Sequence, residues 1–267
     1  MPFNELTGDI LHTVIAVARD AGDKILQIYN RNFDITVKAD RSPLTEADMA
    51  AHEAIISGLK QLTPELPVLS EESASIPFTE RSRWQRYWLV DPLDGTREFI
   101  KRNGEFTVNI ALIDDHRPVI GVIYVPVSDV TYYAVSGKGA FKQAADGQPV
   151  GIRAVAWHGG TVRVAGSRSH RGDSLDAMLE RIGDYEIISM GSSLKSCLVA
   201  EGAAHIYPRF GPTSEWDTAA AQCIVEEAGG RLVDLEMQPL RYNTKESLLN
   251  PSFFVYGDQS QHWAAYF

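Results

Sequence analysis

Apolar residues recur through the first 30 positions at the spacing of one helical face. This pattern predicts an amphipathic helix that packs one side against a core. A second helix is expected to start at Thr45 and to run through Leu59. The apolar positions are Ile10, Val14, Val17, Ala18, Ala21, Ile25 and Ile28 in the first helix, and Ala47, Ala50, Ile55 and Leu59 in the second.

Beyond these helices the pattern changes to short apolar runs with the length of β-strands. The runs 68–70 and 88–90 are each followed at once by acidic residues. The segments 107–113, 119–125 and 130–135 are strand-like and are joined by short connections. Such short connections favour an antiparallel meander.

The second half of the chain alternates between strand-like and helix-like segments after a polar stretch near 146–151. This alternation is typical of an α/β layer. We therefore expect an α+β domain over 1–150 joined to an α/β domain over 151–267. The expected elements are strand 162–165, helix 175–182, strand 186–190, helix 193–204, strand 205–208, helix 218–228, and strands 231–233 and 253–256.

Composition and charge narrow the class of protein. The 267 residues are 44% hydrophobic and 22% charged, as in soluble globular proteins. The formal charge of 25 − 35 = −10 argues against a nucleic-acid-binding surface, although bound cations can still recruit a small anion. The two cysteines, Cys197 and Cys223, form no CxxC pair, which favours a reducing cytoplasm. We expect no transmembrane segment and favour a monomer; peripheral association with the inner membrane stays open.

The most informative segment is Asp91-Pro92-Leu93-Asp94-Gly95-Thr96. We expect an apolar strand to end in Asp91, the proline to force an extended turn, and a helix to begin after Asp94. The two carboxylates could hold one cation or bridge two, with the Leu93 carbonyl as a further oxygen ligand for Mg²⁺. The Gly95 and Thr96 amides could bind a phosphate. Alternatively, Asp94 only caps the helix and Asp91 is a turn residue.

Two other segments carry acids next to apolar runs. Glu71 and Glu72 follow the strand-like run 68–70, and Asp217 opens a stretch of small residues suited to close helix packing. Each has a structural alternative: the glutamate pair as surface charge, and Asp217 as a helix cap.

These three segments together closely resemble the signature blocks of the inositol monophosphatase superfamily, Mg²⁺-dependent and lithium-sensitive phosphatases with a layered αβαβα fold. The resemblance spans nearly the whole chain. It implies that Glu71, Asp91 and the Leu93 carbonyl hold one metal, and that Asp91, Asp94 and Asp217 hold a second. Glu72 would act through water or a third metal.

Asp48 stands three residues after Thr45, as in a capping box, and capping alone would explain it locally. The family resemblance of residues 43–48 implies more: Asp48 would work with the Thr96 hydroxyl to orient and deprotonate the attacking water. No serine, histidine or cysteine nucleophile is then required.

The substrate should be chosen by the second half of the chain. There, serine-rich turns and the basic residues Lys195 and Arg209 could hold a second anionic group. The runs 191–204 and 207–221 resemble the family branch of 3′(2′),5′-bisphosphate nucleotidases. That resemblance implies removal of the 3′-phosphate of 3′-phosphoadenosine 5′-phosphate, giving AMP and clearing a by-product of sulfate assimilation. The nucleotide contacts it implies are Ser167, His170, Ser193, Lys195 and Arg209.

Two alternatives stay open. An inositol or other sugar monophosphatase could use the same metal centre, but its substrate would have no use for Lys195 and Arg209 as ligands of a second phosphate. A metal- or nucleotide-binding regulator without catalysis would bind ligand and release no phosphate.

Overall fold

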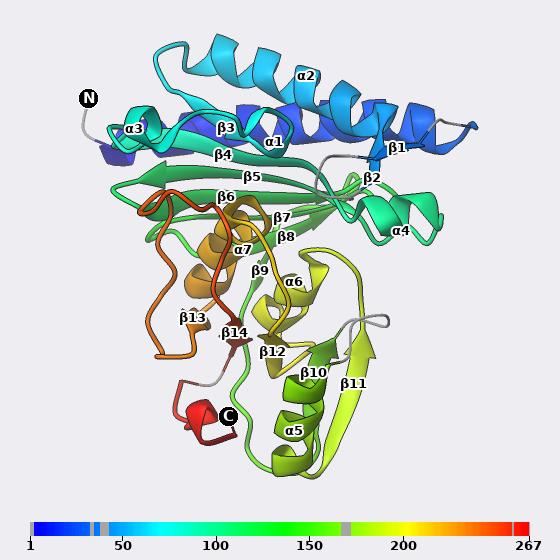
Figure 1. Ribbon diagram of the computed structural model, residues 1–267, viewed down its shortest axis with the longest axis vertical. Coiled ribbons are helices and arrows are strands. Elements are labelled where there is room, and N and C mark those ends of the chain that lie inside the picture. Colours follow the sequence, from blue (N-terminus) through cyan, green and yellow to red (C-terminus); the bar gives the residue numbers. More distant parts are fainter. Residues whose placement is uncertain (1–2, 33–34, 38–42, 167–171, 258, 267) are drawn as a thin grey trace.

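The computed structural model describes residues 3–32, 35–37, 43–166, 172–257 and 259–266. It has five layers, in the order helices, sheet, helices, sheet, helix (Figure 1). The layered αβαβα architecture predicted for the chain is confirmed. Within the described ranges, every helix is too short or too polar to cross a bilayer.

The first layer contains the two predicted N-terminal helices, α1 (Phe3–Tyr29) and α2 (Glu46–Leu62). Their apolar faces, including Val14, Ile25 and Ile55, pack on one side of the large sheet. Thr45 caps α2 as predicted, which fixes where the chain turns into this helix.

The large sheet has seven strands in the order β3-β4-β5-β6-β7-β8-β9. β3 pairs with β4 in parallel and all later neighbours are antiparallel, so the predicted meander is confirmed. The strands β8 and β9, which are only five and three residues long, were not predicted from the sequence. The bounds are β3 Val68–Ser70, β4 Arg86–Asp94, β5 Thr107–Asp114, β6 Arg117–Val125, β7 Val130–Val135, β8 Ala140–Ala144 and β9 Val150–Ile152.

The second sheet has five strands in the order β11-β10-β12-β14-β13. Helices α6 and α7 lie between the two sheets, and α5 covers the outer face of the second sheet (Figure 1). The predicted alternation is confirmed, although α6 is shorter than the predicted helix 193–204. The bounds are β10 Val162–Gly166, α5 Asp173–Ile182, β11 Tyr185–Ser189, α6 Leu194–Ala200, β12 Ile206–Arg209, α7 Glu215–Glu227, β13 Arg231–Asp234 and β14 Phe253–Tyr256. A division into two domains near residue 150 stays a prediction.

Six short elements complete the described structure. They are β1 Ile35–Val37, β2 Pro43–Thr45, the 3-10 turns η1 Glu71–Ser73 and η2 Trp263–Tyr266, and the short helices α3 Phe78–Arg81 and α4 Thr96–Ile100.

Small residues let α7 approach the large sheet closely. Ala219, Ala220 and Ala221 are buried in the core between the sheets. A Cβ placed on Gly121 of β6 would lie 2.4 Å from the Ala220 carbonyl oxygen and 2.9 Å from the Cys223 Cβ. The predicted close packing of the small-residue run is therefore present, and it seats the N-terminus of α7 beside β4 and β5.

Replacing Gly121 with alanine is expected to destabilise the protein by about 1–3 kcal/mol, because the backbone of α7 has to move away from the sheet. Thermal unfolding should show a melting temperature several degrees lower. Gly151→Ala is the matched control, since it lies on β9 with no atom within 4 Å of the added Cβ. Equal melting temperatures for the two variants would contradict this packing.

Candidate metal centre and adjoining cleft

Two parallel strands deliver the first two acids to one place. The register of β3 on β4 pairs Ser70 with Val90, so the next residues, Glu71 and Asp91, follow the same step of the sheet. Parallel neighbours in register place successive residues side by side. The two acid-ended runs noted in the sequence are thus adjacent strands.

A bulge in β4 brings Asp94 to the same side as Asp91. Asp91 lies opposite Asn109 and Asp94 lies opposite Thr107. The chain therefore advances three residues along β4 while it advances two along β5, and β4 has one extra residue. Side chains three residues apart in a regular strand point to opposite faces, and the extra residue cancels this alternation. Pro92, which has no N–H to give to the ladder, fits such a bulge. The prediction that the strand ends at Asp91 in a turn is wrong, because β4 continues to Asp94.

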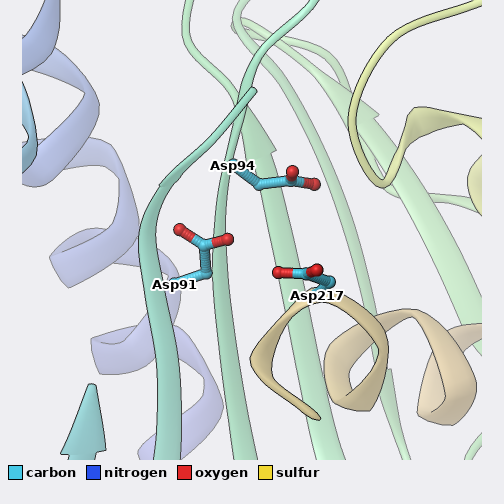
Figure 2. Close-up of side chains that lie close together, drawn as sticks. All are labelled: Asp91, Asp94 and Asp217. Carbon is cyan, nitrogen blue, oxygen red and sulfur yellow. The ribbon is translucent and has the colours of Figure 1, made fainter. Parts of the chain in front are cut away.

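The third acid, Asp217, comes from the first turn of α7. Its Oδ2 accepts a hydrogen bond from the Ser214 amide at 2.9 Å, which completes a capping box. The capping role considered for Asp217 is real, and it aims the carboxylate into the cluster. Oxygens of Asp91, Asp94 and Asp217 lie within 4.8 Å of one another. Figure 2 shows the three carboxylates gathered around a common space.

Burial and mutual repulsion alter the titration of these acids. Burial, followed by the carboxylates of Glu71, Asp94 and Asp217, raises the pKa of Asp91 well above its usual value. Burial and Asp94 raise the pKa of Asp217 to about 8. Without a compensating positive charge, the ionised forms of Asp91 and Asp217 are therefore unfavourable in the folded protein.

A hard divalent cation fits this arrangement. Carboxylate and carbonyl oxygens are the ligands that such cations take, and a bound cation removes the repulsion that raises the pKa values. The described residues that could supply these oxygens include Glu71, Asp91, Asp94 and Asp217. Leu93 lines the same cleft, and its carbonyl oxygen lies 3.5 Å from the Thr96 hydroxyl.

The raised pKa values of Asp91 and Asp217 predict how stability depends on pH without metal. The folded chain keeps protons on these acids that the unfolded chain releases near pH 4, so its free energy of unfolding falls as pH rises from about 4 to about 8. In EDTA, the melting temperature should therefore be lower at pH 8.5 than at pH 6. Asp217→Asn should flatten this slope, and Glu180→Gln on exposed α5 should keep it. A wild-type melting temperature that does not fall between these pH values would contradict the assignment.

Asp48 and Thr96 lie together beside the acids. Asp48 Oδ2 accepts hydrogen bonds from the Thr45 amide and hydroxyl, both at 2.7 Å. Asp48 Oδ1 accepts one from the Thr96 hydroxyl at 3.2 Å. The capping box and the contact predicted with Thr96 therefore coexist, one on each oxygen. Gly95, with φ +98°, gives the chain the left-handed turn it needs before α4.

A cleft of about 780 Å³ opens onto the acids and joins a smaller space of about 140 Å³. Arg209 lines both spaces, and Lys195 lines the smaller one. Burial lowers the pKa of Lys195 to about 8, and its Nζ donates to the Ser192 carbonyl at 2.7 Å. The other lining residues of the large cleft include Leu93, Gly95, Thr96, Arg97, Phe210 and Leu249.

Of the remaining predicted site residues, the structure describes Glu72 and Ser193 only. Glu72 lies half-buried beside Glu71 in η1. Ser193 is buried, and its hydroxyl lies 2.7 Å from Asp94 Oδ2. Ser167 and His170 lie outside the described residues. The roles assigned to all of these residues stay predictions.

Asn109 is a residue that the reading of the sequence missed. It is 1% exposed on β5, and its Nδ2 donates to the Ser193 hydroxyl at 2.9 Å. An asparagine within the apolar run 107–113 was the available signal, because a buried amide needs hydrogen-bond partners.

Comparison with known proteins gives consistent matches over most of the chain. The profile of the inositol monophosphatase family matches residues 8–264. The protein named 3′(2′),5′-bisphosphate nucleotidase CysQ in Escherichia coli K12 is 50% identical over 248 residues, 92% of this chain and 99% of that protein. Its namesake in Haemophilus influenzae is 38% identical over 98% of both chains. The crystal structure of CysQ from Bacteroides thetaiotaomicron superposes with a TM-score of 0.83 at 43% identity, covering 94% of this chain and 98% of that one.

Proposed function

Because the chain belongs to the inositol monophosphatase family, we propose that it is a 3′(2′),5′-bisphosphate nucleotidase. It removes the 3′-phosphate of 3′-phosphoadenosine 5′-phosphate and leaves AMP. The observation that carries the proposal is the 50% identity, over 92% of the chain, to a relative of that name. The acidic cluster that lines the cleft supports it, since cations held by these acids would neutralise the charge of a phosphate ester there.

The metal of this site is proposed to be Mg²⁺, held by Glu71, Asp91, Asp94, Asp217 and the Leu93 carbonyl, with Glu72 further out. When bound, Mg²⁺ would supply charge neutralisation and a more acidic water. The arrangement of oxygen donors supports this choice.

Asp48 and Thr96 are proposed to act on the attacking water. The Thr96 hydroxyl donates a hydrogen bond to Asp48 Oδ1, so its lone pairs remain available to accept a hydrogen bond from water. Asp48 would take up a proton through Thr96, whose hydroxyl would receive the proton of that water as it passes its own proton to Asp48 Oδ1. Its position is stable because the other oxygen caps α2.

The second phosphate of the substrate is proposed to lie near Lys195 and Arg209. Both side chains reach the smaller space next to Asp94. A guanidinium and an ammonium at that place suit an anion better than a neutral ring. Inositol 1-phosphate carries no second anion for them.

The proposal is tested by kcat/KM for phosphate release from three substrates, with and without Mg²⁺: 3′-phosphoadenosine 5′-phosphate, inositol 1-phosphate and fructose 1,6-bisphosphate. A charge-assisted contact of about 1.5–3 kcal/mol predicts a preference of about 10- to 100-fold for the nucleotide. A preference for inositol 1-phosphate would favour the sugar phosphatase. Binding of the nucleotide without any release would favour a regulator.

A further inference from the structure

Asp94 is held on one side by a set of donors from other elements. Its Oδ2 accepts hydrogen bonds from the Ser193 amide at 2.6 Å, the Ser193 hydroxyl at 2.7 Å and the Asn109 amide nitrogen at 3.4 Å. No described residue donates to Asp94 Oδ1. One oxygen of this carboxylate is therefore fixed by the protein, and the other is left for the acidic cluster.

The Thr107 hydroxyl determines which atoms donate and which accept in this set of hydrogen bonds. Its hydroxyl donates to Asn109 Oδ1 at 3.0 Å, which turns Asn109 Nδ2 toward Ser193. The Ser193 oxygen then accepts from Asn109, and its single proton is directed to Asp94 or to the Asp217 carbonyl, 3.0 Å away. One hydroxyl thus contacts both Asp94 on β4 and the backbone of Asp217 on α7.

The turn that carries Ser193 is clamped in place. The Gly191 amide donates to Glu105 Oε2 at 2.8 Å. A Cβ on Gly191 would lie 2.7 Å from the Glu105 carbonyl oxygen, so only glycine allows this approach. Lys195 Nζ holds the Ser192 carbonyl from the other side, at 2.7 Å. A turn held at both ends can keep the Ser193 donors on Asp94 before any ligand arrives.

We propose that Ser193 is a positioning residue for the metal ligand Asp94, with Asn109 behind it, and that it does not bind the nucleotide. This inference rests on the metal centre of the proposed function and replaces the substrate contact that family resemblance implies for Ser193. Hydrogen-bond partners that orient a metal-ligating side chain in this way typically raise the metal affinity 10- to 100-fold.

The test is Mn²⁺ binding to the substrate-free protein, measured by electron paramagnetic resonance and by competition with Mg²⁺. Ser193→Ala should weaken binding about tenfold or more. Ser193→Thr, which keeps the hydroxyl, should stay within about threefold of wild type. Thr131→Val is the matched control: this buried hydroxyl on β7 makes no hydrogen bond with any described residue, and its loss should leave binding unchanged.

A second readout separates positioning from substrate binding. At saturating Mg²⁺, Ser193→Ala should leave KM for 3′-phosphoadenosine 5′-phosphate within about twofold of wild type, because a positioning role acts through the metal. Unchanged metal affinity with a raised KM would overturn the inference and restore the nucleotide contact. Absence of metal binding by the wild-type protein would instead overturn the metal centre of the proposed function.

Discussion

Replacing Asp91 with asparagine is expected to lower kcat for phosphate release by about a thousandfold or more. Asp91 is 1% exposed, and the carboxylates of Glu71, Asp94 and Asp217 all act on its pKa. It is therefore proposed as a ligand of each cation that these acids hold. A metal stabilises the charge of such a transition state by several kcal/mol, and each 1.4 kcal/mol is a factor of ten.

The Asp91→Asn protein should remain folded. Asparagine has the shape of aspartate. Its oxygen can still accept the hydrogen bond that the Leu93 amide donates to Asp91 Oδ1 at 3.0 Å in the wild-type protein. Asparagine is neutral at every pH, so the variant does not lose stability through the raised pKa of Asp91, and the melting temperature of the metal-free protein at pH 8.5 should rise. Asp114→Asn is the control, since that aspartate ends β5 in an ion pair with Arg86, 3.1 Å away. Near-normal turnover by Asp91→Asn at saturating Mg²⁺ would rule out the assignment.

Asp48→Asn and Thr96→Val are each expected to lower kcat by about 10²- to 10⁴-fold, the usual worth of a general base. Asparagine at 48 can still cap α2 through its oxygen, but it turns an N–H toward the Thr96 hydroxyl, 3.2 Å from the present carboxylate oxygen. The hydrogen bond between the two side chains is then reversed, and no base remains. KM should change much less than kcat, because neither side chain is assigned to hold the substrate through its charge.

The double variant distinguishes a catalytic pair from two separate contributions. If Asp48 and Thr96 act on one water, the two losses should overlap. The kcat of Asp48→Asn/Thr96→Val should then lie within about tenfold of the kcat of the slower single variant. Thr96→Ser keeps the hydroxyl and should retain most of the activity. Fully multiplicative losses would contradict a shared water and indicate two separate contributions. An active Asp48→Asn protein would leave Asp48 with its capping role alone.

The first helix and the strands of the meander could be predicted from the sequence because their hydrophobic patterns are long and regular. The apolar face from Ile10 to Ile28 and the strands of the 107–135 meander carry such patterns. The strands β8 and β9 could not be predicted in this way. Their residues are partly exposed, and no alternation of buried and exposed positions marks them. They are strands because β8 pairs with β7 and β9 pairs with β8.

The identities of the clustered acids were predictable, but the way they come together was not. Glu71 and Asp91 are neighbours because β3 and β4 pair in parallel, a pairing that depends on the intervening chain. The bulge at Pro92 depends on the partner strand β5. For Asp48 and Asp217, capping and site chemistry had seemed alternatives. A carboxylate has two oxygens, and here one caps a helix while the other faces the site.

The contact that Ser193 makes could not be predicted from the sequence. The pattern of serines before α6 predicts hydroxyls at a helix start and says nothing of what they touch. The contact of Ser193 with Asp94 requires two turns 99 residues apart to pack closely, and this depends on Gly191 approaching Glu105. Such a contact is determined by tertiary packing.

The most direct test of the whole account is ³¹P NMR of 3′-phosphoadenosine 5′-phosphate incubated with the protein, with Mg²⁺ and with EDTA. We expect the 3′-phosphate signal to disappear only with Mg²⁺, while the 5′-phosphate persists as AMP and inorganic phosphate appears. Loss of the 5′-phosphate instead, turnover in EDTA, or an unchanged spectrum in Mg²⁺ would contradict it.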